Sequence, residues 1–138
     1  MDSTALTALS PVDGRYRKAA DGLRAVLSES GLIRERIRIE AAWLLALAES
    51  VPQLLNQPLP DGVRQLAASM ALEPGDDAPA AVKTIEARIN HDVKAVEYFV
   101  REKPTQAGAT PATLELVHFG CTSEDINNLA YARMLRAA

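Results

Sequence analysis

Aromatic residues make up only 4% of this 138-residue chain, so its hydrophobic core must be built from Ala, Leu, Val and Ile. The single cysteine, Cys121, excludes an internal disulfide framework and fits a reducing compartment. No apolar run approaches the length of a membrane span, and no basic-plus-apolar signal segment opens the chain. We therefore predict a cytoplasmic protein that has no membrane partner.

Positive net charge is absent as well. The formal charge is -3 at pH 7 and the pI is about 5.4, which argues against a nucleic-acid surface. Only two histidines, His91 and His118, accompany the cysteine, so no cluster of metal ligands is expected. Glycine-rich phosphate loops are also missing. The sequence thus predicts no nucleic-acid partner, no metal ion and no cofactor.

What the chain does contain is helical periodicity. Hydrophobic residues account for 48% of the sequence, and they recur at helical spacing without period-2 alternation, so we predict an all-α fold. Its length allows one compact domain. Helices are expected over residues 17–31, 32–50, 63–72, 80–89 and 110–119. Another helix is expected to begin after an N-cap at Asp92, and a last one to begin at Thr122 or Ser123. Loops are expected at Met1–Tyr16, 52–62 and 73–79, and a linker at 103–111.

The stretch 117–128, VHFGCTSEDINN, gathers most of the specific chemistry. Thr122 followed three residues later by Asp125 is a capping-box pattern, which predicts a helix start at Thr122 or Ser123. Such a start offers free backbone N–H groups and the positive end of the helix dipole, so its two hydroxyls suit a carboxylate or phosphate. On residue types alone, a plain helix cap is the commoner alternative.

Two further places carry polar side chains beside a break in the pattern. Arg15 and Tyr16 directly follow a turn signal, and a guanidinium beside a phenol suits a phosphate. Asn90, His91 and Asp92 separate two helical stripes, where the His91 ring can face a cavity. On residue types alone, Arg15 and Tyr16 can instead be an ordinary surface pair, and His91 can be a structural histidine.

The arginines of the second long helix are interpreted as structural. Arg34, Arg36 and Arg38 occupy alternate positions that point apart, so we expect them to be solvated or paired with Glu35 and Glu40. They form no single anion patch.

The remaining reactive side chains receive structural interpretations too. We expect His118 to pack and Trp43 to lie in the core or at an interface. Lys94 can either belong to a site beside His91 or pair with Glu97 on the helix surface, and the sequence leaves both open. Cys121 has no base or cation near it in sequence, so a nucleophilic role has little support.

Three motifs in order, SPVDGRY, NHDVKAVEYF and HFGCTSEDINNLAYARML, resemble those of the adenylosuccinate lyase family in the fumarase/aspartase superfamily. The resemblance is strongest at 9–16, 83–99 and 117–135 and weak at 51–81. It implies a carbon-nitrogen lyase of purine biosynthesis, which eliminates fumarate from adenylosuccinate, giving AMP, and from the succinylated imidazole-carboxamide ribotide. It also implies substrate-binding roles for Arg15, Tyr16, Asn90, His91, Asp92, Thr122 and Ser123.

The resemblance further implies that the chain is an amino-terminal portion. In this family a His in a TH-x-Q motif is the general acid and a Ser of a mobile loop ending in MPxKxN is the general base. Neither motif occurs here, so we expect no catalytic residue in the chain and no turnover by the chain alone. Residues 1–110 correspond to the helical amino-terminal domain, and residues 111–138 to the truncated start of the central helical bundle of a homotetramer.

The last helix carries an apolar stripe whose partners are then expected in the missing bundle, which predicts a helix that is exposed, frayed or packed on a neighbouring molecule. Its members are Ile126, Leu129, Ala130, Met134 and Leu135. Two other functions remain open: a self-contained helical interaction module without catalysis, and a small enzyme that uses His91 as its acid-base group.

Overall fold

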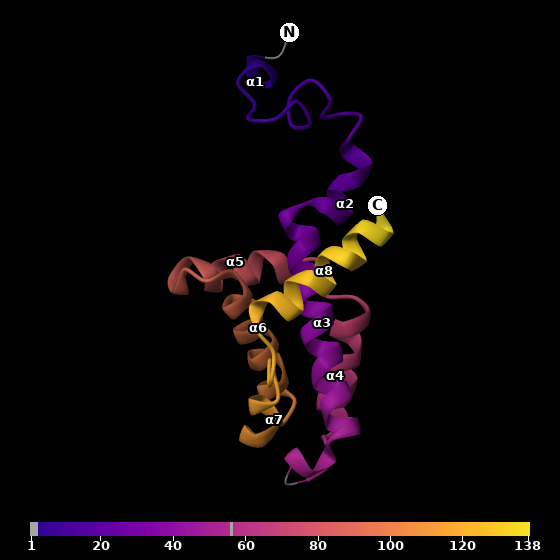
Figure 1. Cartoon of the computed structure of the whole chain (residues 1–138). Coiled ribbons are helices and arrows are strands. Elements are labelled where there is room, and N and C mark those ends of the chain that lie inside the picture. The colour runs from indigo at the N-terminus through magenta and orange to yellow at the C-terminus, as the bar shows by residue number, and fades with distance from the viewer. Residues whose placement is uncertain (1–2, 56) are drawn as a thin grey trace.

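A computed structural model describes residues 3–55 and 57–138, and these residues contain helices and no β-strand (Figure 1). The predicted all-α fold is confirmed. The helices are α1 (Ser3–Leu6), α2 (Arg24–Leu27), α3 (Glu29–Ser50), α4 (Asp61–Leu72), α5 (Ala78–Ile89), α6 (Asp92–Gln106), α7 (Pro111–Glu115) and α8 (Ser123–Ala137).

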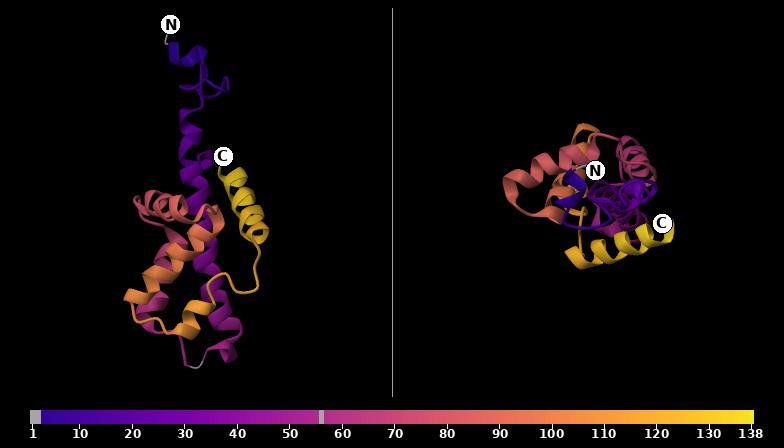
Figure 2. Two further views of the ribbon diagram at one scale, coloured as in Figure 1. Left: turned by 90° about the vertical axis from the view of Figure 1, so that its left-hand side faces the viewer. Right: turned by 90° about the horizontal axis from the view of Figure 1, so that it is seen from above.

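Helix α3 is the central element of the body, and α4, α6 and α8 pack along it (Figures 1 and 2). The Ser28 hydroxyl begins this helix by accepting a hydrogen bond from the backbone N–H of Gly31 at 3.2 Å. Ten of its 22 residues are buried, and its buried hydrophobic residues are divided among three separate clusters. The helix is therefore surrounded by neighbours on several faces.

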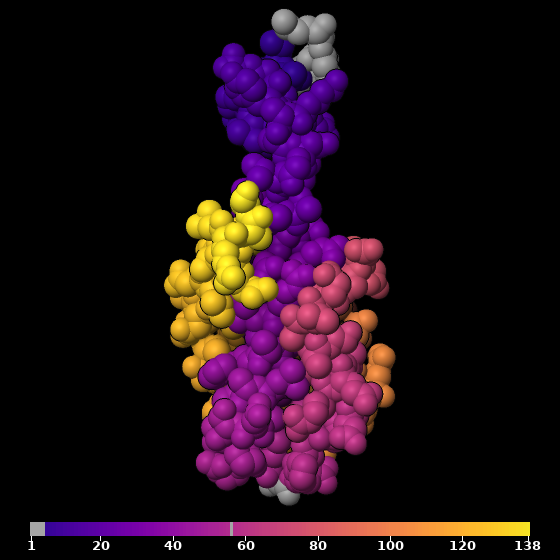
Figure 3. Space-filling model, turned by 90° about the vertical axis from the view of Figure 1, so that its right-hand side faces the viewer, coloured from indigo at the N-terminus to yellow at the C-terminus, as the bar shows by residue number. Residues whose placement is uncertain are grey.

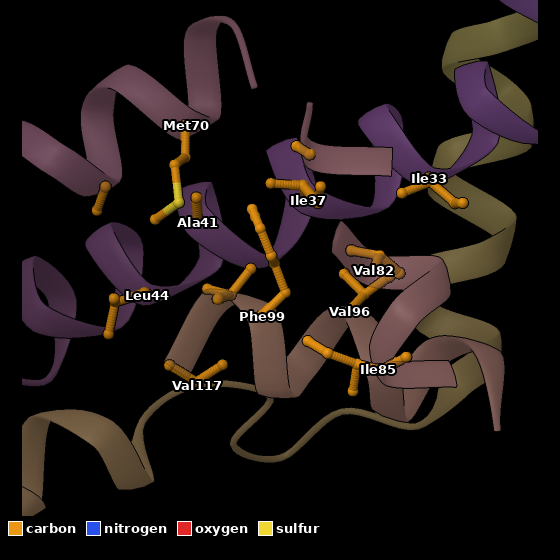
Figure 4. Packing of buried hydrophobic residues seen from close by; sticks show 14 of the residues in the cluster. Ile33, Ile37, Ala41, Leu44, Met70, Val82, Ile85, Val96, Phe99 and Val117 are labelled. Atoms are coloured by element: carbon orange, nitrogen blue, oxygen red, sulfur yellow. The ribbon is translucent and has the colours of Figure 1, made fainter. Parts of the chain in front are cut away.

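The main core fills the space between α3, α4, α5 and α6 (Figure 4). Ile37 and Leu44 of α3 are fully buried and face Met70, Val96 and Phe99. Phe99 is the only aromatic residue among the buried hydrophobic residues that the structure describes. Aliphatic packing thus dominates the core, where each fully buried side chain contributes about 1.5–3 kcal/mol.

The amino-terminal elements differ from the prediction. A continuous helix over 17–31 is wrong, because turns cover 17–20, a 3-10 turn covers Asp21–Leu23, and α2 ends at Leu27. Gly31 does not stop a helix. It lies in the first turn of α3 and faces the Val26 carbonyl so closely that a Cβ would clash. The predicted loop Met1–Tyr16 contains the single turn α1, while residues 1, 2 and 56 of the predicted loops lie outside the described residues.

The helices predicted at 32–50, 63–72 and 80–89 are confirmed as α3, α4 and α5, each of which begins two or three residues earlier. The linker predicted from Lys103 is wrong at its start, because α6 continues to Gln106 with Pro104 inside it. Proline lacks an N–H and removes one helical hydrogen bond, but the Pro104 ring is fully buried in the last turn. The helix predicted over 110–119 is shorter, since α7 ends at Glu115.

Helix α8 lies along the side of α3 and is not detached from the body (Figure 3). Ile126, Ala130 and Met134 are buried within this chain, so the prediction that the whole stripe awaits outside partners is wrong. The expectation holds only for Leu129 and Leu135, which are 51% and 73% exposed. The buried part of the stripe finds its partner in α3 itself.

Residues 3–20 form a lobe that projects beyond the helical body (Figures 1 and 3). Its ion pair between Asp13 and Arg24 is solvent-exposed, and at 3.5 Å it adds little stability. None of the described helices combines the length and apolar character that a bilayer crossing requires.

Leu44→Ala is expected to lower the free energy of unfolding by about 2–5 kcal/mol, because it removes a fully buried side chain and leaves a cavity. Leu72→Ala is the matched control at a position that is 80% exposed. It should change the same free energy by less than about 0.5 kcal/mol. Urea unfolding followed by circular dichroism measures both, and equal effects would contradict this core.

Candidate functional site

The junction between α5 and α6 presents Asn90, His91 and Asp92 in three different backbone conformations. Asn90 ends α5 in the left-handed region, with φ of 53°. His91 is extended and is the N-cap of α6, because its Nδ1 accepts the Lys94 backbone N–H at 3.1 Å. The predicted N-cap at Asp92 is therefore wrong by one residue. Asp92 is the first helical residue, where its negative charge faces the positive end of the helix dipole.

Arg36 connects this junction to α8. Its side chain extends from α3 and is only 5% exposed. One terminal nitrogen donates to Asp92 Oδ2 at 2.8 Å, and Nε donates to Asn127 Oδ1 at 2.9 Å. The expectation that Arg36 is solvated or paired with glutamate is thus wrong, because it bridges three helices. Arg38 follows the expectation by pairing with Glu35, whereas Arg34 pairs instead with Glu73 and Asp76 after α4.

The Asp92 carboxylate is held in its ionised form. Partial burial opposes ionisation, but the Val93 backbone N–H and the Arg36 guanidinium outweigh that effect and lower the pKa of Asp92 below its ordinary value. A buried cation and a charged carboxylate therefore meet at the start of α6. This charge-assisted contact is stronger than a neutral hydrogen bond.

The start of α8 confirms the predicted capping box. Asp125 Oδ2 accepts the Thr122 backbone N–H at 2.7 Å and the Thr122 hydroxyl at 2.9 Å. These bonds lower the pKa of Asp125, the backbone bond most of all. The Thr122 hydroxyl is therefore occupied in this structure. Ser123 is half-buried, and among the described residues its hydroxyl has no hydrogen-bond partner.

Two of the three candidate segments lie side by side. Val93, next to Asp92, belongs to the same small buried cluster as Ile126, which is three residues after Ser123. Apolar packing and the Arg36 bridge thus join the starts of α6 and α8. The third segment is apart from them, because Arg15 and Tyr16 lie in the projecting amino-terminal lobe. The Arg15 guanidinium lies 4.6 Å from the centre of the Tyr16 ring, so the pair stacks internally.

Sequence interpretation missed a second buried polar contact. Glu40 of α3 is fully buried, and its Oε1 lies 2.5 Å from Nδ1 of His118. Burial raises the pKa of Glu40, and the nearby Glu97 adds to this effect while His118 opposes it. Arg36 and Glu40 are four residues apart on the apolar face of α3. Polar residues inside an apolar stripe were the signal that could have found both.

Trp43 is 36% exposed and lies outside the core, whereas Lys94 and Cys121 have surroundings that suit a structural role. Lys94 pairs with Glu97 at 2.8 Å. Burial, and then the charges of Glu40 and Asp125, raise the pKa of Cys121, which disfavours a nucleophilic thiolate. Among residues 3–55 and 57–138, no three His, Cys, Asp or Glu side chains are grouped as metal ligands. The arrangement offers hydrogen-bond donors and helix N-termini, which suit anion binding.

Arg36→Gln is expected to lower the free energy of unfolding by about 2 kcal/mol, because charge-assisted bonds to Asp92 and Asn127 are lost. Lys83→Gln is the matched control, since it removes only exposed ion pairs to Glu29 and Glu86 and should change the free energy of unfolding much less. Chemical unfolding at neutral pH measures both. If Arg36→Gln lowers the free energy of unfolding no more than Lys83→Gln does, Arg36 does not bridge the helices as described.

The same variant tests pH dependence. The pKa of Asp92 is lowered by folding, so its contribution to stability is present above the ordinary pKa of 3.8 and is lost as pH falls through the folded value. The unmodified chain should therefore lose more stability on acidification than Arg36→Gln does. Parallel stability-against-pH curves for the two proteins would show that Asp92 is not held by Arg36.

Comparison with known proteins identifies relatives over the whole chain. Adenylosuccinate lyase of Escherichia coli strain K12 is 46% identical over 143 residues, and that of Haemophilus influenzae is 41% identical over 138 residues. The Legionella pneumophila strain Corby enzyme is 36% identical over 140 residues. Each alignment covers 100% of this chain and 30% of the relative, so the chain spans less than a third of their length.

A family model described as "Lyase" matches residues 14–138. The matched range includes the starts of α6 and α8 and the arginine between them. The resemblance predicted from the three sequence motifs is confirmed. The chain belongs to this lyase family.

Proposed function

We propose that this chain contributes substrate-binding residues to an adenylosuccinate lyase, a carbon-nitrogen lyase that releases fumarate from adenylosuccinate. The observation that carries the proposal is the Arg36 bridge, which holds the starts of α6 and α8 together through Asp92 and Asn127. Two motifs that are far apart in sequence thereby become one surface. The relatives that match the whole chain support the choice of reaction.

The start of α8 is proposed to hold a carboxylate of the succinyl group. Elimination begins when a proton leaves the carbon beside a carboxylate, and negative charge then builds on that group. Free backbone N–H groups at the helix start stabilise such charge, and the unpaired Ser123 hydroxyl adds a donor. Thr122 can join when its hydroxyl turns from Asp125 to the ligand.

The start of α6 is proposed to contact the same substrate through Asn90, His91 and Asp92. Because His91 Nδ1 accepts a backbone N–H, the proton of the neutral ring is on Nε2, and this N–H is directed away from the cap. The His91 side chain is 55% exposed, so a ligand can reach it. The ring is thus prepared as a hydrogen-bond donor of fixed tautomer.

Arg15 and Tyr16 are proposed to hold the phosphate of the nucleotide. Arginine suits phosphate because its planar group donates two parallel hydrogen bonds. The lobe that carries both residues projects away from the other two segments (Figure 2). A homotetrameric enzyme, in which one site takes residues from several subunits, accounts for this separation.

The proton-transfer groups are proposed to lie outside these 138 residues. The proposed division assigns 1–110 to an amino-terminal domain and 111–138 to the start of a central bundle. Gly108, with φ of 85°, and the Thr110 cap of α7 support a boundary there. The one carboxylate that the described residues place beside the His91 ring is that of Asp92, 3.8 Å from Nδ1, and Arg36 already holds it. This chain is therefore proposed to provide binding groups and not the complete chemistry.

A chimera tests the proposed function. The aligned segment of the E. coli adenylosuccinate lyase is replaced by this chain, with which it shares 46% identity. The chimera is expected to release fumarate from adenylosuccinate, and His91→Ala in it should reduce kcat/KM by at least about a hundredfold. Lys94→Ala is the matched control at a half-buried neighbour that pairs with Glu97, and its rate should change little. A folded tetrameric chimera without activity would contradict the proposal.

The chain by itself is expected to show no fumarate release, because proton-transfer groups act as a unit whose loss removes most of the rate. It should bind adenylosuccinate only at about millimolar concentrations. Backbone amide shifts in an NMR titration should move at Asn90–Asp92 and Thr122–Ser123. Turnover that survives repurification and disappears in His91→Ala would instead show that the chain is a complete catalyst.

A further inference from the structure

We propose that Glu40 and Trp43 of α3 are positioning residues, which together hold the turn at 116–121 and so set where α8 begins. This inference rests on the proposed function only in saying what α8 binds. The contacts by which Glu40 and Trp43 position the turn lie within this chain. Glu40 and Trp43 are three residues apart, so they project from neighbouring positions on one side of α3.

The first hold is a side-chain contact. Glu40 Oε1 lies 2.5 Å from His118 Nδ1, and Glu40 is fully buried. Its second oxygen, Oε2, is also buried and has no hydrogen-bond partner among the described residues. In the part of the chain that the structure describes, His118 is therefore the only hydrogen-bond partner that compensates for burying this carboxyl group. An uncompensated polar group is costly, which fixes the ring against α3.

The second hold is on the backbone of the next residue. Trp43 Nε1 donates to the Phe119 carbonyl at 2.9 Å. The Phe119 ring itself is 48% exposed, so packing of that ring does not anchor the turn. Two polar contacts from α3 thus grip consecutive residues of one turn, the first through a ring and the second through a carbonyl.

The turn needs such contacts because part of its backbone adopts an unfavourable left-handed conformation. His118 has φ of 62°, a left-handed conformation that costs a side chain with a Cβ of the order of 1–2 kcal/mol. Gly120 has φ of 72°, which glycine adopts without strain. The Cys121 backbone N–H then donates to the His118 carbonyl at 3.2 Å and closes the turn. Thr122, the N-cap of α8, is the next residue.

The position of the α8 start therefore depends on α3. Upstream, Leu116 and Val117 are each 3% exposed and belong to the main core. Downstream, Cys121 packs on the buried cluster that contains Ile126. The turn between these two anchors contains the left-handed residues, and among the described residues its only hydrogen bonds to α3 are those with Glu40 and Trp43. Loss of these two contacts should loosen the start of α8 while the segments on both sides of the turn remain packed.

Glu40→Leu separates a local hold from a general stabilising role. Replacing a buried charge by an apolar side chain of similar size is often neutral for global stability. We expect unchanged protection of the Val96 amide in α6, but at least about tenfold faster hydrogen exchange of the Cys121 amide. Glu40→Gln keeps a hydrogen-bonding partner for His118 and should restore most of that protection. Glu49→Leu, at an exposed position of α3, is the matched control and should change neither amide.

Trp43→Phe removes the indole N–H and keeps an aromatic ring. It should also speed exchange at Cys121 and shift the Gly120 amide resonance, with little change at Val96. If Cys121 exchange is unchanged in both Glu40→Leu and Trp43→Phe, the proposal is overturned. It is equally overturned if both variants lose protection at Val96 and Cys121 by the same factor, since the residues would then stabilise the fold as a whole.

Fumarate, the dicarboxylate released by the proposed reaction, provides the ligand experiment. In the unmodified chain it should shift the Thr122 and Ser123 amides, and Glu40→Leu should weaken that response at least about threefold. An absent response in the unmodified chain would contradict the proposed function. The exchange measurements would still decide the role of Glu40 and Trp43, because they require no ligand. If fumarate shifts these amides equally in the unmodified chain and in Glu40→Leu, the contacts of Glu40 and Trp43 do not set the geometry of the binding site, and that claim is overturned.

Discussion

The buried guanidinium of Arg36 is the interaction on which the candidate site depends. Its cost is the removal of a cation from water, and it persists because Asp92 and Asn127 satisfy it at 2.8 and 2.9 Å. These two partners are the first residue of α6 and a residue in the second turn of α8. One side chain of α3 therefore fixes the relation between two helix starts.

A second polar contact on the same face of α3 acts on the approach to α8. Glu40 lies four residues after Arg36 and contacts His118, just before the α8 cap. The apolar stripe of α3 thus carries two buried polar side chains, and each is matched by a partner from a distant segment. Hydrophobic packing provides most of the stability, while these contacts specify which residues meet.

The sequence predicted elements whose signals are local. The capping box at Thr122 and Asp125 and the helix boundary at Asn90 were correct, because a cap is decided by a few neighbouring residues. The place of Arg36 within the apolar stripe signals its burial, but its partners are 56 and 91 residues away in sequence and no local pattern identifies them. His91 was passed over as a cap because imidazole is an unusual N-cap acceptor. The separation of the Arg15 lobe from the other motifs is likewise a tertiary property.

The central claim is that Arg36, Asp92 and Asn127 act as one unit, and double-mutant cycles test it most directly. The cycles combine Arg36→Gln with Asp92→Ala and with Asn127→Ala, and unfolding free energies are measured for every single and double variant. We predict coupling of about 1–2 kcal/mol in the Asp92 cycle and a smaller favourable coupling in the Asn127 cycle. Single effects that add to within about 0.5 kcal/mol in both cycles would contradict it.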